Sequence, residues 1–258
     1  MKKLFSAAVM LTALTLSAEN LFTLSAPQDF NNPQKLTAAG DALETAAPGW
    51  FMSIKQMEID PAKTYRIEGE FRTAPGKTVK GKLSIGFYGL DKDGHVIQVT
   101  SVNAAAGSET ELAAPVNAAD TVLKIKDGSK WQNQGYVAYD VDPSGKQRDL
   151  PCKTVLNAIT KTVKKNGAVY EVTLAQSAGK NLAAGVAVRQ HLPGWSFLSS
   201  DRVDVTDGWR KISWTVKPGA EKKNTRHQWL FGSKKFICVI VAPAGVQFRG
   251  VTVSAEDK

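Results

Sequence analysis

The sequence predicts an all-β protein, and three observations lead to this prediction. Apolar and polar residues alternate in several segments, which is the pattern of half-buried strands. Turn-forming residues (Gly, Pro, Asn and Asp) interrupt the chain roughly every 8–12 residues, as in β-sandwich proteins. No long segment shows the 3.6-residue period of an amphipathic helix. Together these observations predict a β-sandwich, with strands in two packed layers.

The first clear strands lie in the amino-terminal third of the chain. In "TYRIEGEFRT" (64–73) charged residues alternate with an apolar face made of Tyr65, Ile67, Gly69 and Phe71. "KLSIGFYGL" (82–90) leads into a "DKDG" turn, and "HVIQVTSV" (95–102) follows it. This arrangement predicts a β-hairpin.

The middle of the chain has its own series of short predicted strands. They are "TVLKIKD", "GYVAYDV", "TVLNAITKTVKK", "AVYEVTLA" and "GVAVRQH", and turn sequences such as "DPSGK" and "KNG" separate them. We interpret residues 107–194 as an inserted β-subdomain. Residues 19–106 and 195–258 on either side then form one sandwich.

The last predicted strands complete this sandwich. "WRKISWTV" (209–216) and "VQFRGVTVS" (246–254) alternate, whereas "KFICVIVA" (235–242) is almost continuously apolar. A continuous apolar run of this length is typical of a central strand that is covered on both faces.

The first 18 residues have the features of a secretory signal peptide. Lys2 and Lys3 precede an apolar run, and small residues at 17–18 provide a cleavage site after Ala18. The run is shorter than the ~20 residues that span a membrane. We therefore expect a secreted, periplasmic or cell-surface protein of bacterial type, without a membrane span.

The formal net charge of the chain is +9, of which Lys2 and Lys3 supply two charges. A basic exported protein suits acidic polysaccharides or anionic surfaces, although the charge is equally explained by solubility alone. We expect a glycan partner, neutral or acidic, and no nucleic acid.

Two cysteines, Cys152 and Cys238, would lie in an oxidising compartment. Cys238 belongs to a predicted core strand and Cys152 to a predicted loop. The sequence leaves open whether they form a disulfide or remain two buried thiols.

Three fragments of the predicted sandwich resemble a known family. "IDPAKTYRIEGEFRTAPGK", "VDVTDGWRKISWTVKPGA" and "VQFRGVTVS" are similar to strands of jelly-roll carbohydrate-binding modules with the galactose-binding-like fold. The resemblance covers roughly residues 20–105 and 195–255. It implies a jelly-roll sandwich and a non-catalytic, carbohydrate-binding function.

These modules often hold a structural calcium ion through acids in the closing strand, where this chain has Arg249 and Gly250. A second candidate for calcium, "DVDPSG" (140–145), has no acid at the twelfth position, which is Pro151. We therefore expect no cofactor, with structural calcium as an open alternative.

Motifs of known catalytic sites are absent from the sequence. The three histidines lie in separate segments without metal-ligand spacing, and neither HExxH nor GxSxG occurs. "GKTVKGKL" (76–83) resembles a phosphate-binding loop, but Leu83 stands where Ser or Thr would be needed. The prediction is that the chain is not an enzyme, although a glycosidase-like carboxylate pair has no sequence signature of its own.

The six tryptophans are the main candidates for sugar contacts, because an indole ring can cover the flat C–H face of a pyranose. Trp214, Trp131 and Trp209 are predicted to be structural, from strand alternation or from their place at the edge of a core. Trp50 and Trp195 each follow a Pro-Gly turn, and Trp229 lies among polar residues.

The predicted ligand-binding residues are Trp50, Trp195, Trp229, Arg189, His191 and Arg226. The prediction is a non-catalytic, exported, carbohydrate-binding protein. Two alternatives remain from the sequence: a structural or protein-interaction sandwich without a sugar site, and a glycan-active enzyme.

Overall fold

The structure, a computed structural model, describes residues 18–222 and 226–257. These residues form an all-β chain with eighteen strands and three short 3-10 helices, η1 (Pro27–Asp29), η2 (Pro33–Lys35) and η3 (Val99–Ser101). The predicted signal peptide lies outside the described residues, apart from Ala18. Among the described residues, no helix has the length and apolar character needed to cross a membrane.

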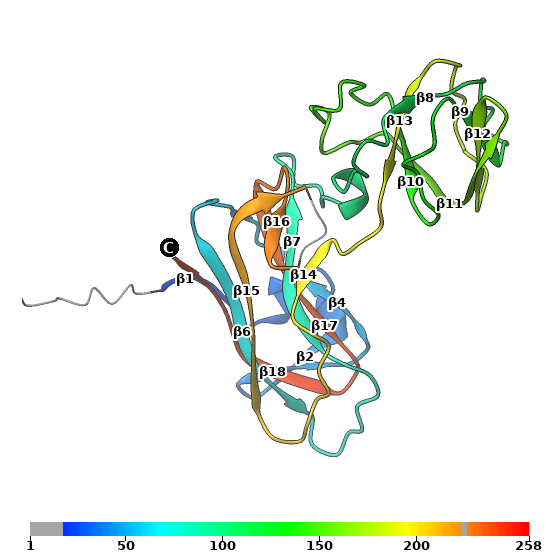
Figure 1. The fold of residues 1–258 in the computed structure, drawn as a ribbon. Helices are drawn as coiled ribbons and strands as arrows, with labels where there is room; N and C mark the ends of the chain where they lie inside the picture. Colours follow the sequence, from blue (N-terminus) through cyan, green and yellow to red (C-terminus); the bar gives the residue numbers. More distant parts are fainter. Residues whose placement is uncertain (1–17, 223–225, 258) are drawn as a thin grey trace, which may run out of the picture.

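The first sheet contains seven strands (Figure 1). Their spatial order is β16 (Gln228–Leu230), β15 (Arg210–Glu221), β6 (Thr64–Thr73), β18 (Val246–Glu256), β3 (Ala42–Thr45) and β2 (Leu36–Ala39), and β1 (Glu19–Leu24) also pairs with β18. Only β15 and β16 are parallel among these pairs. Burial alternates strictly along β6, so the strand predicted over 64–73 is confirmed with its apolar face inward.

The second sheet contains five strands and packs against the first. It is built from β14 (Phe197–Ser199), β7 (Ser84–Leu90), β17 (Lys235–Ala242) and β4 (Gly49–Met52), and β5 (Met57–Glu58) also pairs with β17. The core between the sheets combines side chains from both, as in the edge-to-face pair of Tyr65 from β6 and Phe236 from β17, whose ring centroids are 5.1 Å apart. The sandwich-like arrangement of the prediction is therefore present.

Strand β17 is apolar at nearly every position because side chains on both of its faces are buried. Phe236, Cys238 and Ile240 point into the core between the sheets. Ile237 and Val239 belong to a second apolar cluster on the outer face of the five-stranded sheet. The prediction of a central strand covered on both faces is confirmed, because β17 lies between β7 and β4.

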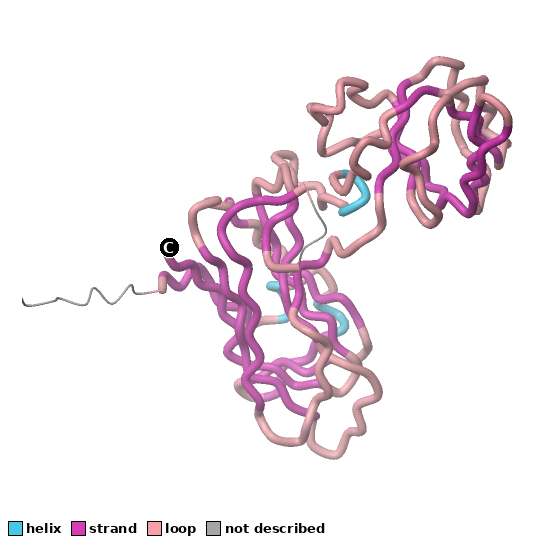
Figure 2. The backbone as a smooth tube through the Cα atoms, viewed as in Figure 1, coloured by secondary structure: helices cyan, strands magenta, loops and turns pink. Residues whose placement is uncertain are grey.

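The remaining six strands form a separate sheet between β7 and β14 in the chain. Their order is β8 (Thr110–Glu111), β13 (Ala187–His191), β10 (Tyr136–Tyr139), β11 (Val155–Asn166), β12 (Val169–Leu174) and β9 (Val122–Ile125). The sheet curls until its edges meet, where the Ala113 N–H donates to the Lys124 carbonyl at 2.8 Å. It encloses its own core and projects from the sandwich (Figures 1 and 2). We call it the inserted unit; its strands all fall within the predicted range 107–194.

The hairpin predicted over residues 82–102 is only half present. Its first strand, β7, and the turn at 91–94 form, with the Gly94 N–H donating to the Asp91 carbonyl at 3.1 Å. The expected return strand is replaced by one isolated bridge and the helix η3. The reason is packing: Ile97, Val99 and Val102 bury themselves against Leu230 instead of extending the sheet. Alternating apolar residues alone do not reveal this.

Both cysteines are buried as free thiols. Cys238 lies in the core of the sandwich, while Cys152 packs with Val141 and Leu150 of the inserted unit. Of the two alternatives that the sequence left open, the structure has the two buried thiols. Burial raises the pKa of the Cys238 thiol, which keeps this group protonated and unreactive.

Candidate functional site

Two of the predicted tryptophans are exposed to solvent. Trp50 is 41% exposed and Trp195 is 59% exposed. Among the described residues they are the only exposed Phe, Tyr or Trp side chains. A large aromatic side chain usually loses most of its accessible surface on folding, so these two exposed indoles are the candidates for ligand contact.

Trp50 belongs to an aromatic cluster on the outer face of the five-stranded sheet, which we define as Trp50, Tyr88 and Phe197. The Trp50 and Tyr88 rings are nearly parallel, with an interplanar angle of 16° and centroids 6.0 Å apart. The Phe197 centroid lies 5.2 Å from Trp50 and 5.4 Å from Tyr88. The three residues occupy outward positions of β4, β7 and β14, opposite their core-facing neighbours in each strand.

Trp195 lies next to this cluster in the chain, two residues before Phe197. The sandwich thus brings the Trp50 ring next to Phe197, which follows Trp195 by two residues although Trp50 and Phe197 are far apart in the sequence. The shared Pro-Gly-Trp sequence places each tryptophan near the start of an edge strand of the same sheet. Trp50 is in β4, and Trp195 precedes β14.

The structure corrects the prediction for Trp229. This side chain is 1% exposed and lies in the sandwich core, where it stacks on Phe236 with centroids 5.4 Å apart. It also contacts the rings of Tyr65 and Phe87. Short strand β16 carries it inward, so the indole has no face to offer a ligand.

The predictions for Arg189 and His191 are also corrected, because both side chains are fully buried. The Arg189 guanidinium binds Asp149 through two hydrogen bonds, Nη1 to Oδ1 at 3.1 Å and Nη2 to Oδ2 at 2.8 Å. Its Nε donates to His191 Nε2 at 3.0 Å, and His191 Nδ1 lies 2.6 Å from the Thr100 carbonyl. Since Nε2 accepts, Nδ1 carries the proton and donates. These polar groups join the inserted unit to the sandwich, and the side chains of Arg189 and His191 have no exposed surface to offer a ligand.

We expect this arrangement to make stability depend on pH. Burial, followed by the charge of Arg189, lowers the pKa of His191 from 6.5 to about 4. As the pH falls, the unfolded chain binds this proton first, so stability is unaffected above about pH 6.5 and decreases toward pH 4. The loss should total about 3 kcal/mol. Urea titrations at pH 7 and pH 4.5 measure it, and His191→Gln should remove this part of the decrease. An identical pH dependence in both proteins would contradict the expectation.

Arg226 is the one predicted polar residue that keeps partial exposure, with 38% of its side chain accessible. It forms an ion pair with Asp201 at 2.9 Å, just beyond the end of β14. The structure therefore does not group it with Arg189 and His191.

The tryptophans predicted to be structural have structural contacts. Trp131 is 7% exposed in the core of the inserted unit and donates its indole N–H to the Ser108 carbonyl at 2.8 Å. Trp214 packs against the sandwich core. The Trp209 ring contacts the guanidinium groups of Arg72 and Arg249, at 4.4 Å and 4.3 Å, on the seven-stranded sheet.

A cavity of about 740 Å³ lies where the inserted unit meets the sandwich. We call it the junction cavity. Residues from the β7–η3 segment, from 151–155 and from the loop before β17 line it, so the sequence gives no local signal for it. Cavities between two folded units are common ligand sites. Its charged lining is of mixed sign, with Asp91, Asp93, Lys153 and Lys234.

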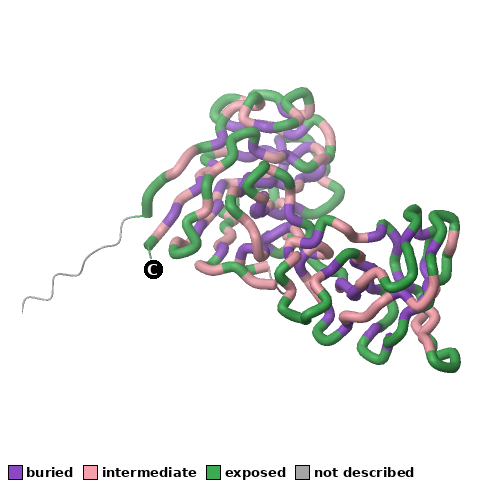
Figure 3. Tube along the Cα trace, turned by 90° about the horizontal axis from the view of Figure 1, so that it is seen from above, coloured by how far each residue is buried: buried purple, intermediate pink, exposed green. Residues whose placement is uncertain are grey.

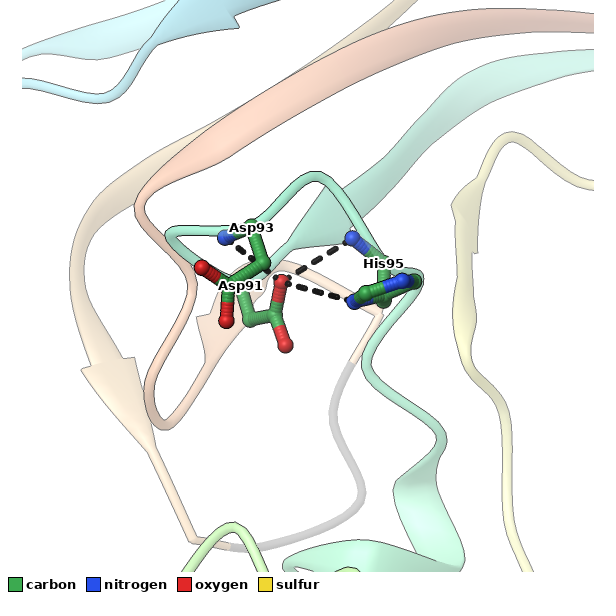
Figure 4. Close-up of side chains that lie close together, drawn as sticks. All are labelled: Asp91, Asp93 and His95. Carbon is green, nitrogen blue, oxygen red and sulfur yellow. Dashed lines mark hydrogen bonds and ion pairs between the residues drawn. The ribbon is translucent and has the colours of Figure 1, made fainter.

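One group of possible metal ligands lies at this cavity: Asp91, Asp93 and His95 (Figure 4). Their ligand atoms lie within 4.8 Å of one another, a grouping missed in the sequence because the Asp-x-Asp-x-His spacing spans a tight turn. Asp91 Oδ1, however, accepts the backbone N–H groups of Asp93 and His95, each at 2.9 Å. These bonds, that from His95 first, lower the pKa of the Asp91 carboxyl.

Lysines already neutralise the two carboxylates of this group. Lys92 Nζ lies 2.7 Å from Asp93, and Lys153 Nζ lies 3.6 Å from Asp91. A cation would have to displace both ammonium groups, so the arrangement is better suited to holding the turn than to binding a metal.

At both segments considered for calcium, the nearby carboxylates already have partners. Asp142 accepts the backbone N–H of Ser144 at 3.0 Å, and hydrogen bonds, first from the Ser144 side chain, lower its pKa to about 2. Arg249 binds Glu70 at 2.9 Å and Asp41 at 2.8 Å. The Arg249 guanidinium thus neutralises Glu70 and Asp41. It lies in the closing strand, where the resembling modules have acids instead.

Comparison of the chain with family models, curated protein sequences and solved structures gives no match.

Proposed function

We propose that this chain is an exported, non-catalytic, carbohydrate-binding protein whose glycan stacks on Trp50 and Trp195. The observation that carries the proposal is the exposure of these two indoles, 41% and 59%; Trp50 belongs to the aromatic cluster, and Trp195 precedes its member Phe197 by two residues. Stacking needs a flat ring that is held rigidly, because an ordered ring loses little entropy on binding. The contacts of Trp50 with Tyr88 and Phe197 provide this support.

The proposed fold assignment is a jelly-roll sandwich of the galactose-binding-like kind, carrying the inserted unit. The two facing sheets and the strand fragments that resemble such modules support it. Export through the signal peptide at 1–18 would place the protein where polysaccharides are found.

A protein-interaction role is the second candidate, and the same exposed aromatic surface favours it. Tryptophan and tyrosine are enriched in protein interfaces, where they act as buried anchors. The two roles differ in the partner that covers the indoles, so a direct glycan-binding experiment separates them.

We expect polysaccharides immobilised in native gels to retard the wild-type protein. Trp50→Ala and Trp195→Ala should each weaken retention by about ten-fold, which corresponds to ~1.4 kcal/mol, the upper range of an aromatic stacking contact. Trp209→Ala is the matched control, since it makes the same change on the opposite sheet and should leave retention unchanged.

Three results would overturn the proposal. The first is a folded wild-type protein that no polysaccharide in a panel of neutral and acidic polymers retards. The second is normal retention of both the Trp50→Ala and the Trp195→Ala variant. The third is release of sugars from the panel, which would replace a binding protein with a glycan-active enzyme.

A further inference from the structure

A hollow of about 420 Å³ lies beside Trp50, at the end of the five-stranded sheet away from Tyr88. We call it the Trp50 hollow. Its lining consists of Pro48, Gly49, Trp50, Lys80, Gly81, Lys82, Val241, Ala242 and Pro243. Its volume lies within the ~300–1,000 Å³ that is typical of sites for small molecules.

The pairing of the strands shows how the Trp50 hollow relates to the aromatic cluster. Trp50 pairs with Val241 of β17, whereas Tyr88 pairs with Ile237, four residues earlier in that strand. The hollow uses residues 241–243 of the same segment. Trp50 lines the hollow, and its indole also stacks on Tyr88, so this residue connects the hollow with the aromatic cluster.

The charge of the Trp50 hollow has a single sign. Lys80 and Lys82 are its only charged residues, and both are exposed. Lys82 Nζ lies 3.4 Å from Asp204, a pair with 52% and 78% exposed side chains that solvent screens strongly. The junction cavity differs, because the carboxylates of Asp91 and Asp93 also line it and pair with Lys153 and Lys92.

From this hollow we infer that the glycan is acidic, with a carboxylate or sulfate group held by Lys80 and Lys82 while its ring covers Trp50. The inference rests on the proposed function and names its substrate class. An ammonium group contacts an anionic substituent as a point charge, so either anion suits the site. The loop that carries both lysines lies against Pro243, because a Cβ built on Gly81 would be 3.4 Å from the Pro243 ring.

The experiment compares polymers that differ only in charge. Affinity gels contain polygalacturonate or its methyl ester, which lacks the charge, and dextran sulfate or plain dextran. We expect stronger retention by the anionic member of one pair, and the pair identifies carboxylate or sulfate. Raising the salt concentration from 50 to 500 mM should weaken this retention, because the contact is electrostatic and exposed.

The lysines are tested by Lys80→Gln and Lys82→Gln. Each substitution should weaken retention by the anionic polymer about three-fold, as exposed ion pairs do, and the double variant about ten-fold, while retention by the neutral polymer stays unchanged. The matched control is Lys161→Gln with Lys164→Gln, which removes the same charge from exposed positions of β11 in the inserted unit. This control should behave as wild type.

The inference is overturned if neutral and anionic polymers retard the protein equally, or if the lysine pair and its control have the same effect. In those cases Trp50→Ala still reduces retention, so the proposed function survives. If no polymer retards the protein, or if the tryptophan variants do not matter, the proposed function fails as well.

Discussion

Replacing Arg189 by methionine is expected to lower the free energy of unfolding by about 3–5 kcal/mol. The guanidinium is fully buried and holds Asp149 with two hydrogen bonds, while Glu109 Oε1 lies 3.9 Å away. Methionine fills much of the space but leaves both carboxylates without their cation in a poorly solvated position. The loss of the Nε bond to His191 adds to the cost. Urea denaturation followed by circular dichroism measures the change.

Two further variants test whether charge is the cause. The exposed Arg202→Met should change stability by less than about 0.5 kcal/mol, because it lies away from any buried network. The double variant Arg189→Met with Asp149→Leu should recover part of the loss, since an apolar pair needs no compensating charge. A single variant within 1 kcal/mol of wild type would contradict the argument, because that is far below the cost of an uncompensated buried charge.

Strands of this protein could be predicted from the sequence where the pattern of apolar residues reports which of their faces are exposed to solvent. The period of two in "TYRIEGEFRT" locates β6 at residues 64–73 with the correct buried face. The continuous apolar run of β17 likewise predicts a covered central strand. Both patterns are local, because each position reports its own contact with water or core.

The environment of the polar and aromatic candidates could not be predicted in the same way. In the sequence, "RQH" at 189–191 looks like a set of hydroxyl-binding side chains. All three residues are nevertheless 0% exposed, and Figure 3 shows buried segments in the inserted unit as well as in the sandwich. Their partners, Asp149 and Thr100, lie 40 and 91 positions away from Arg189 and His191. Only the tertiary structure brings these groups together.

The tryptophans show the same limit. Trp50 and Trp229 both have polar or turn residues around them in the sequence, but β4 turns one outward and β16 carries the other into the core. The two strands belong to different sheets, and that topology is decided by long-range pairing. A residue's neighbours in the chain therefore do not reveal whether an indole will support the fold or meet a ligand.

The difference in burial between Trp229 and Trp50 predicts a large difference in the stability of their alanine variants. Trp229→Ala should lower the free energy of unfolding by about 3–5 kcal/mol, because it removes a fully buried indole from the contacts with Tyr65, Phe87 and Phe236. Trp50→Ala should cost only about 1 kcal/mol, since 41% of that side chain is already exposed. Guanidinium titrations of both variants measure the difference.

The two variants should rank in the opposite order when loss of glycan retention is measured instead of loss of stability. At a temperature where both proteins are folded, Trp229→Ala should bind as wild type does, because its indole has no exposed face. Trp50→Ala should be nearly as stable as wild type but retained about ten-fold less. A folded Trp229→Ala variant that loses retention while Trp50→Ala keeps it would reverse the assignment, and the buried core would then have to open for the ligand to bind.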